Sequence, residues 1–466
     1  MTDNALSGLC RLTVRAPDKT VDLSVPADIP VADLLPALLA YAGDGLAEAG
    51  VDHDGWVLQR LGGKPLDHEA TLEAQHARDG EVLYLRPHAE ALPEVHLDDL
   101  VDGIYTTMRD RPFGWTPVVG KRVLLTAGAL CQLLALTVLG LSDTSGTVTA
   151  LAAGAFALLT LGGAAAASRA IGDAGAGTAL GAMVPAYLAV AGWVLPGGDL
   201  TGPGLHEVLG ARLLAACASA AAGAVLAVAA VAAFATVFLA LCAVAVAGAA
   251  AGVLLLVADM PPEHASGLLA VTAVVFGAFV PSLSFRLAGL RMPPIPTNAE
   301  ELQEGIEPHA PSVVAERSVL ADGWMTGLYA AAGTICAACV AGLSVRPTLA
   351  QNVTTAVLSL LLLLHARVLG NTLQRLSLTA PGVLGAVSLV RTAFLGATPG
   401  QQLLLVAALL AVTAVLTVAS WTVPGNRLVP YWGRAAELAH SAAAIALLPL
   451  ALWVLGVYGA LRALAA

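Results

Sequence analysis

The pattern of hydrophobic and polar positions divides this chain of 466 residues into two unlike parts. In residues 9–88, apolar positions alternate with polar ones or recur at helical intervals, as in a small water-soluble domain. Beyond residue 121, long apolar runs follow one another with few charged residues between them. The pattern therefore predicts a soluble N-terminal head followed by a domain that spans a membrane.

The head pattern predicts a small α+β domain. Period-two alternation indicates strands over 9–15 and 21–25, joined as a hairpin. Apolar residues at helical intervals indicate a helix over 31–42, ended by glycines. Short apolar runs at 56–58 and 82–85 indicate two further strands.

Residues 94–111 have the pattern of a separate amphipathic helix. Its apolar face holds Leu97, Leu100 and Ile104 at helical spacing, and three aspartates occupy the opposite face. Anionic lipid headgroups repel an acidic helix, so we expect this face to pack on protein. A solvated linker helix is the alternative.

Eleven runs beyond residue 121 are long enough to cross a bilayer, which takes about 20 apolar residues. The run from Leu205 to Ala258 counts as two spans. As one helix it would extend about 80 Å at ~1.5 Å per residue, against a hydrocarbon core of ~30 Å. We place its break near residues 230–233. The other nine candidates are 122–141, 148–167, 174–195, 264–288, 320–344, 348–369, 376–396, 401–421 and 436–459.

The distribution of Lys and Arg predicts the orientation in the membrane. An odd number of spans places the two termini on opposite sides. With the head inside, twelve near-membrane Lys or Arg residues lie in the cytoplasm and four lie outside, as the positive-inside rule requires. We therefore expect a cytoplasmic N-terminus and an outer C-terminus.

Composition narrows the function classes. Hydrophobic residues make up 57% and charged residues 12%, which excludes a soluble globular protein of this size. Residues 1–120 hold 20 acidic and 9 basic residues, a net charge of −11, whereas the rest of the chain has 13 acidic and 14 basic residues, so the acidity of the chain lies in its N-terminal part. This acidity disfavours nucleic acid and anionic lipid as partners of the head.

The segment 291–319 is the one long loop predicted between spans, on the cytoplasmic side. Its prolines favour a stiff, extended arm, and a threonine followed three residues later by a glutamate fits the start of a short helix. A docking arm and a solvated connector are both compatible with this pattern. The arm residues are Arg291, Pro293, Pro294, Pro296 and Thr297.

The sequence offers no catalytic, cofactor or metal motif. It contains no GxxxxGK[ST] phosphate loop, HExxH, EF-hand or GxSxG, so we expect no nucleotide hydrolysis by this chain. Cys336 and Cys339 form a CxxC inside an apolar run, where small packing residues are expected rather than a metal or redox site.

The centres of the predicted spans also lack Asp, Glu, Lys and Arg, while His365 and His440 lie toward span ends. Ion-coupled transporters usually keep ionisable residues near the midplane, so this pattern disfavours transport.

The second half of the head resembles ubiquitin-like β-grasp domains. The resemblance is carried by residues 58–67 with their Gly-Gly-Lys turn, by Thr71-Leu72 and by the final strand at 79–86. Conjugating members of that family end in a free Gly-Gly, whereas this chain continues past Pro87. The resemblance therefore implies a docking module, with a generic α+β domain as the alternative.

A ubiquitin-like head joined to eleven uncharged spans resembles the EccD family, the multi-spanning component of the type VII (ESX) secretion machinery of actinobacteria. Further similarity lies in 293–297, in 430–437 and in 449–458. The fold class expected is an α-helical polytopic membrane protein with eleven transmembrane helices and an N-terminal ubiquitin-like β-grasp (α+β) domain. The domains expected are 1–90 (cytosolic head), 91–121 (linker helix) and 122–466 (membrane domain, with the cytoplasmic loop at 291–319).

The resemblance implies a non-enzymatic scaffold in the bacterial inner membrane, without cofactor or nucleic acid. Such scaffolds form homodimers whose spans enclose membrane lipids. Their heads dock on an EccC-like motor ATPase, with EccB-like and EccE-like subunits as neighbours. We expect docking at residues of the head, the linker helix and the arm: Leu58, Arg60, Leu61, Leu97, Leu100, Ile104, Arg291, Pro293, Pro294, Pro296 and Thr297.

Two other function classes remain open at this point. One is a secondary transporter or channel with a cytosolic regulatory domain. The other is a membrane-tethered signalling adaptor, in which the head alone carries the function.

Overall fold

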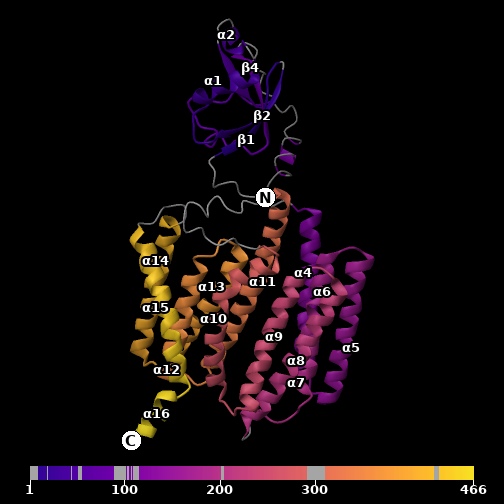
Figure 1. Cartoon of the computed structure of the whole chain (residues 1–466), viewed down its shortest axis with the longest axis vertical. Helices are drawn as coiled ribbons and strands as arrows, with labels where there is room; N and C mark the ends of the chain where they lie inside the picture. The colour runs from indigo at the N-terminus through magenta and orange to yellow at the C-terminus, as the bar shows by residue number, and fades with distance from the viewer. Residues whose placement is uncertain are drawn as a thin grey trace, which may run out of the picture. The chain divides into compact units, whose positions relative to one another are not determined.

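The chain forms two compact units, Met1–Thr116 and Pro117–Ala466 (Figure 1). This computed structural model describes residues 9–88 apart from 18, 44 and 51–54, the single positions 101, 104, 105 and 108, and residues 115–200, 204–290, 310–423 and 430–465.

The head is a four-stranded mixed sheet with the strand order β2-β1-β4-β3. β1 pairs antiparallel with β2 and parallel with β4, and β3 pairs antiparallel with β4. The predicted strands and helix are confirmed, and a further short helix, α2, follows the first. The elements are β1 (Leu9–Arg15), β2 (Thr20–Pro26), α1 (Val31–Ala42), α2 (Leu46–Ala49), β3 (Trp56–Gln59) and β4 (Glu81–Pro87).

Large apolar side chains fill the interior of the head. The alternation along β1 buries Leu12 and Val14, and β4 buries Leu83 and Leu85 in the same core. Helix α1 covers them with the apolar residues that its 3.6-residue spacing places on one face. This is the ordinary core of a water-soluble domain, with the period of each element deciding what is buried.

The turn after β3 explains the glycines of the ubiquitin-like motif. Gly62 has a φ of 76°, in the left-handed region that favours glycine. Gln59 Nε2 donates a hydrogen bond to the carbonyl oxygen of Gly63 at 2.7 Å and so closes the turn. The side chains within this turn lie at the surface of the head.

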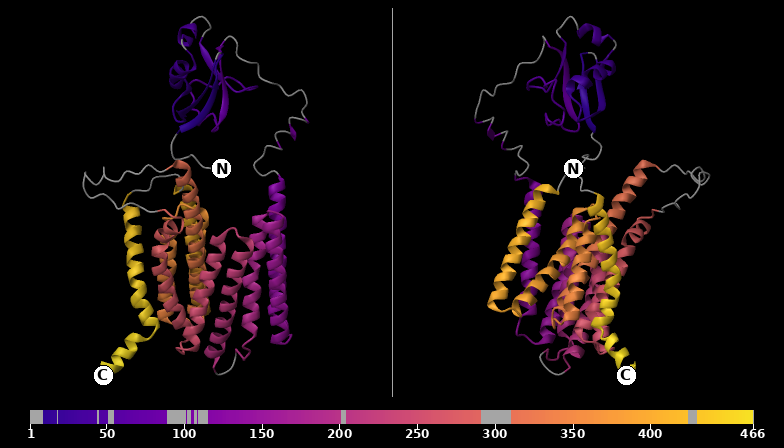
Figure 2. Two further views of the ribbon diagram at one scale, coloured as in Figure 1. Left: turned by 45° about the vertical axis from the view of Figure 1, so that its right-hand side comes forward. Right: turned by 90° about the vertical axis from the view of Figure 1, so that its left-hand side faces the viewer.

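Eleven helices of the described membrane unit are long and apolar enough to cross a membrane, as predicted (Figures 1 and 2). Two spans are composite: α5 continues into the π-helical turn η3, and α6 continues into α7. The elements are α4 (Pro117–Gly140), α5 (Gly146–Ala165), η3 (Ala166–Ala170), α6 (Ala174–Gly181), α7 (Met183–Val194), α8 (Leu205–Val231), α9 (Ala235–Leu256), α10 (Pro262–Leu287), α11 (Pro311–Leu343), α12 (Leu349–Ala366), α13 (Thr372–Leu395), α14 (Pro399–Thr422), α15 (Pro430–Val454) and α16 (Val457–Ala465).

The long apolar run is broken between α8 and α9, where it was expected. Ala232 and Phe234 adopt left-handed φ values of 53° and 48°, which end one helix before the next begins. Arg169 donates to the carbonyl oxygens of Ala229 and Ala230, and Ser168 donates to that of Val231. These side chains satisfy the last carbonyl groups of α8, which would otherwise lack hydrogen-bond partners.

Glycine and alanine allow the membrane helices to approach closely. A Cβ atom at Gly252 of α9 would lie 2.6 Å from the backbone nitrogen of Leu214 in α8, and one at Gly177 would lie 2.9 Å from the Cβ of Ser168. Small residues at helix interfaces are the usual means of packing spans, because apolar burial drives little association in lipid.

Some helix boundaries differ from the prediction. Helix α11 begins at Pro311, so residues 311–319, predicted as loop, are helical. The polar pair Glu316 and Arg317 lowered the hydropathy of this segment and concealed the helix start. After α15, the left-handed Gly456 (φ 73°) redirects the chain into the separate helix α16, which turns away from the axis of α15 (Figures 1 and 2).

Candidate functional site

The head residues expected to dock a partner differ in how far they are buried. Leu58 on β3 is 1% exposed and belongs to the core, so the structure removes its side chain from any docking surface. Strand β3 is short and every residue in it is buried, which its apolar run alone did not reveal. Leu61, in the turn after β3, is 71% exposed and remains available.

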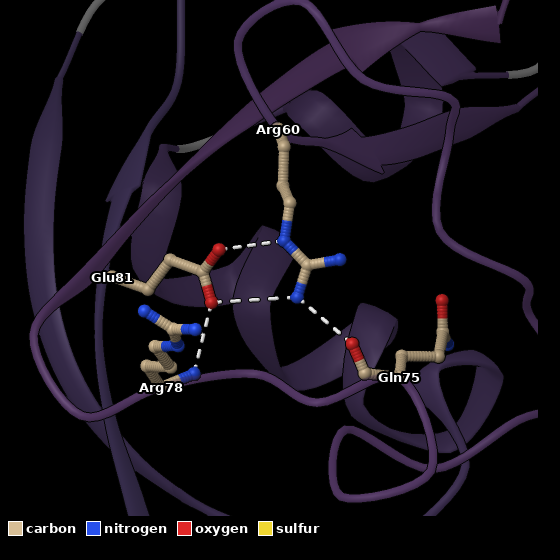
Figure 3. Close-up of polar contacts among 4 residues, drawn as sticks. All are labelled: Arg60, Gln75, Arg78 and Glu81. Atoms are coloured by element: carbon tan, nitrogen blue, oxygen red, sulfur yellow. Dashed lines mark hydrogen bonds and ion pairs between the residues drawn. The ribbon is translucent and has the colours of Figure 1, made fainter. Parts of the chain in front are cut away.

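Arg60 is fixed at the surface by an ion pair (Figure 3). Its Nε atom lies 2.6 Å from Glu81 Oε1, and its Nη2 atom donates to the carbonyl oxygen of Gln75 at 2.9 Å. The backbone N–H of Arg78 donates to Glu81 Oε2 at 2.9 Å. The two ends of the motif, at β3 and β4, are thereby held together.

The charge state of this pair is set by the same contacts. Partial burial by itself raises the pKa of Glu81. Hydrogen bonds from the Arg60 side chain and the Arg78 backbone, together with the positive charges of both arginines, outweigh that effect and hold the pKa below its ordinary value. Arg60, Arg78 and Glu81 line an open depression with His76 and Asp79, so this face carries both signs of charge.

The linker helix contributes exposed apolar side chains. Leu97 and Leu100 lie outside the described residues. Ile104 is helical and 49% exposed, and Tyr105 and Met108 are likewise helical and exposed. The described part of the predicted apolar stripe is therefore present at the surface of the protein.

The proline arm lies outside the described residues, so its five predicted docking residues have no placement: Arg291, Pro293, Pro294, Pro296 and Thr297. Its two ends are described. Arg317 Nη1, in the second turn of α11, donates to the carbonyl oxygen of Gly289 at 2.8 Å. This bond joins Gly289, two residues past the end of α10, to the second turn of α11.

The membrane domain brings together two histidines that are 75 residues apart in the sequence. His365 Nδ1 lies 3.2 Å from His440 Nε2, and His365 Nε2 lies 3.2 Å from the hydroxyl of Tyr329. The sequence placed both histidines near span ends but gave no signal of their contact, because it depends on how α11, α12 and α15 pack.

A second polar cluster escaped the sequence analysis. Asp322 on α11 accepts hydrogen bonds from Asn371 Nδ2 at 2.7 Å and from Gln374 Nε2 at 2.8 Å. Gln374 also donates to the hydroxyl of Thr326 at 3.0 Å, and its side chain is buried. These contacts fasten α11 to the start of α13. The sequence feature that could have indicated this cluster is the carboxylate of Asp322 near one end of an apolar run.

The CxxC cysteines lie on the buried face of α11. Cys336 and Cys339 both belong to a packing cluster with apolar residues of neighbouring helices. Among the described residues, no group of three or more His, Cys, Asp or Glu side chains could hold a metal ion.

Two family models match the chain, one for each unit. Residues 120–464 match the EccD-like transmembrane domain. Residues 9–85 match the model of YukD, a protein of the WXG100 protein secretion system.

Relatives and solved structures agree with these matches. The ESX-4 secretion system protein eccD4 of Mycobacterium tuberculosis is 32% identical over 98% of this chain and 97% of its own length. The ESX-3 secretion system protein EccD3 of the same species is 28% identical over 39% of this chain and 41% of its own length.

Among solved structures, protomer 1 of the ESX-3 core complex has a similar fold, with a TM-score of 0.59 at 20% identity, covering 97% of this chain and 99% of that one. A chain of the MycP5-free ESX-5 inner membrane complex gives a TM-score of 0.57 at 20% identity, over 88% of this chain and 99% of that one. At this identity the structures support the fold.

Proposed function

This chain belongs to the EccD family of type VII (ESX) secretion proteins, and from this premise we propose that it is a dimeric membrane scaffold that docks a motor ATPase through its head. As a member of that family, it is a structural membrane subunit of the secretion machinery. The dimer, the ATPase and the orientation in the inner membrane are parts of the proposal.

The proposal rests on one observation: a single chain contains both a head and a membrane domain that match secretion-system families. The head, residues 9–85, matches a secretion-system protein, and residues 120–464 match a membrane domain of such a system. A small soluble domain attached to a large membrane domain suits a subunit that holds a cytoplasmic partner against the membrane. The proposed partners are an EccC-like motor ATPase, with EccB-like and EccE-like subunits beside it.

Two peripheral spans support dimer formation. No residue of the most apolar stretch of α4 or of α14 is buried within the chain. Helix α4 is held by polar contacts: Lys121 Nζ lies 2.6 Å from Asp173 Oδ2, and Tyr187 donates to Gln132 Oε1. Such spans leave long apolar faces for lipid and for a second copy of the chain.

The docking residues that we propose are Leu61 and Arg60 on the head and, on the linker helix, the exposed apolar side at Ile104. Leu61 offers an exposed apolar side chain, and the ion pair with Glu81 fixes Arg60 beside it. Because the Arg60 side chain is already held in place, binding a partner there would cost little further conformational entropy, which suits a stable subunit contact.

Pull-down from native membranes tests the docking. We expect the wild-type protein to co-purify with an EccC-like ATPase and Leu61→Asp to lose most of it, because a carboxylate replaces the apolar contact. Tyr41→Asp is the matched control, since Tyr41 is also an exposed apolar residue, on α1. Equal recovery with Leu61→Asp and wild type would contradict docking through this surface, and ATP hydrolysis by the purified chain would contradict the scaffold.

Orientation is tested separately. We propose that the head is cytoplasmic and the C-terminus lies outside, because this orientation places most near-membrane Lys and Arg residues on the cytoplasmic side. A protease added outside intact cells should then leave residues 9–88 uncut. Cleavage there would invert the orientation and remove the head from any cytoplasmic partner.

The Tyr329, His365 and His440 contacts favour a second candidate, a proton-coupled transporter or channel with a regulatory head. Ionisable side chains inside spans often mark ion pathways. Uptake into proteoliposomes driven by a proton gradient, and lost in His365→Gln, would establish this candidate. No uptake would leave the scaffold as the function.

A further inference from the structure

We propose that Tyr329, His365 and His440 form a site of the membrane domain that binds one proton, and only one, at the junction of α11, α12 and α15. This inference does not depend on the scaffold function. Ionisable side chains are costly to bury among apolar groups, so a bonded pair of imidazoles beside an apolar cavity calls for a role.

The geometry is that of a hydrogen-bonded chain. The imidazole nitrogens His365 Nδ1 and His440 Nε2 are 3.2 Å apart, whereas the ring centroids are 5.3 Å apart with 27° between the planes. The rings therefore meet edge to edge along the line between these nitrogens. The second nitrogen of His365, Nε2, lies 3.2 Å from the Tyr329 hydroxyl, so both ring nitrogens of His365 are engaged.

The bonding rules of imidazole set the neutral states of this chain. A neutral imidazole has one N–H donor and one acceptor nitrogen. In one state, Tyr329 donates to His365 Nε2, and His365 Nδ1–H donates to His440 Nε2. In the other, His440 Nε2–H donates to His365 Nδ1, and His365 Nε2–H donates to the oxygen of Tyr329.

The same rules fix the capacity for extra protons. From the second neutral state, a proton from water can bind at His440 Nδ1, the one ring nitrogen of the pair outside these contacts, and both hydrogen bonds remain. The bridging proton can then lie on either imidazole. A further proton would place N–H groups against each other at Nδ1 of His365 and Nε2 of His440, and the bond would be lost. The site therefore holds a single extra proton.

The surroundings isolate this site from other titrating groups. It lies beside a cavity of about 120 Å³, large enough for water. Helix α10 lines the cavity with alanine, valine and glycine, α13 lines it with Leu378, and α11 adds Cys336 to Tyr329. The charged and titratable residues of α10 lie at its ends: Glu263, His264 and Arg286.

The charged groups on the other packed helices have their own contacts or face outward. Asp322 on α11 is bound by Asn371 and Gln374. Arg375 on α13 donates to the carbonyl oxygens of Ala366 and Arg367 at the end of α12.

On α15, Arg434 and Glu437 are exposed.

The test is a titration of the full chain in lipid nanodiscs with ¹⁵N-labelled histidine. Chemical shifts of ring nitrogens distinguish protonated from unprotonated sites. We expect the signals of His365 and His440 to change together, in one step that takes up one proton. Two separate steps that take up two protons would overturn the proposal, and so would the absence of any step before the protein unfolds.

Variants identify the site and guard against misfolding. His440→Gln should abolish the shared step and leave His365 to titrate alone. Tyr329→Phe preserves the ring and the packing but removes the oxygen that accepts from the protonated pair, so the step should move to lower pH by about one unit, a tenfold loss of proton affinity. His264→Gln, a histidine in the first turn of α10, is the matched control and should leave the step unchanged.

Discussion

The head and the membrane domain solve opposite packing problems. The head buries leucine, valine and tryptophan and exposes charged side chains, whereas the membrane domain buries mainly alanine, glycine and polar side chains and exposes more leucines than it buries. Water drives large apolar groups inside the head. Lipid accepts them at the surface of the membrane domain, so there close contact and hydrogen bonds hold the helices together. Substitutions of one residue type should therefore have unequal effects on stability in the two units.

The largest difference is expected for leucine. Leu58→Ala empties part of the head core and should lower the free energy of unfolding of the head by about 3 kcal/mol. Leu403→Ala on α14, where Leu403 is 72% exposed, should change the stability of the membrane domain far less, because lipid replaces the lost side chain. Denaturant-dependent hydrogen exchange of peptides from each unit measures both values. Similar losses at the two positions would break the comparison.

The next effect concerns the buried polar contacts of the membrane domain. Asp322→Ala removes the carboxylate that accepts from Asn371 and Gln374, so the buried amide of Gln374 loses one of its hydrogen-bond partners. We expect a loss of about 2 kcal/mol in the stability of the α11–α13 region, since unpaired buried polar groups are costly. Asp322→Asn retains one acceptor oxygen and should lose less. If Ala and Asn cost the same, the hydrogen bonds contribute nothing.

Substitution of glycines at close helix contacts in the membrane domain should have the next largest effect on stability. Gly252→Ala places a methyl group 2.6 Å from the Leu214 nitrogen and should destabilise the α8–α9 pair by about 1.5 kcal/mol through overpacking. Gly154→Ala on α5 is the control, because a Cβ there meets nothing within 4 Å and alanine favours the helix. Thermal unfolding in detergent should rank wild type and Gly154→Ala above Gly252→Ala, and the reverse ranking would contradict close packing.

These contrasts also explain what the sequence could predict. Local periodicity fixes elements, so the strand over 9–15, the helix over 31–42 and the eleven spans follow from the order of apolar residues. The break between α8 and α9 follows from length, because one helix would exceed the bilayer. Helix α11 was expected to begin nine residues too late, since its first turns are polar and lie beyond the apolar window.

Contacts between distant segments could not be predicted in this way. The contact between His365 and His440 depends on how α12 packs against α15. The bond between Asp322 and Gln374 depends on how α11 packs against α13. No local pattern encodes such pairs. In the head, the motif placed Leu58 and Leu61 three residues apart, but only the strand pairing determines that one is buried and the other exposed.

The smallest effect is expected at the surface of the head, where polar groups meet water. Arg60→Ala breaks the ion pair with Glu81 and should cost less than about 1 kcal/mol, because the pair is partly exposed. Since the folded pKa of Glu81 lies below its ordinary value, the pair stabilises the head above that value and loses its effect as the pH falls through the folded pKa. The difference in denaturation midpoint between wild type and Arg60→Ala, followed by exchange of peptides from residues 9–88, should therefore be largest at pH 7 and shrink toward pH 3. Lys19→Ala is the control, because Lys19 lies outside this ion pair and should give a difference that does not shrink with acid. A difference for Arg60→Ala that persists at low pH would assign the effect to the hydrogen bond with Gln75 and to packing of the arginine side chain instead of to the charge of Glu81.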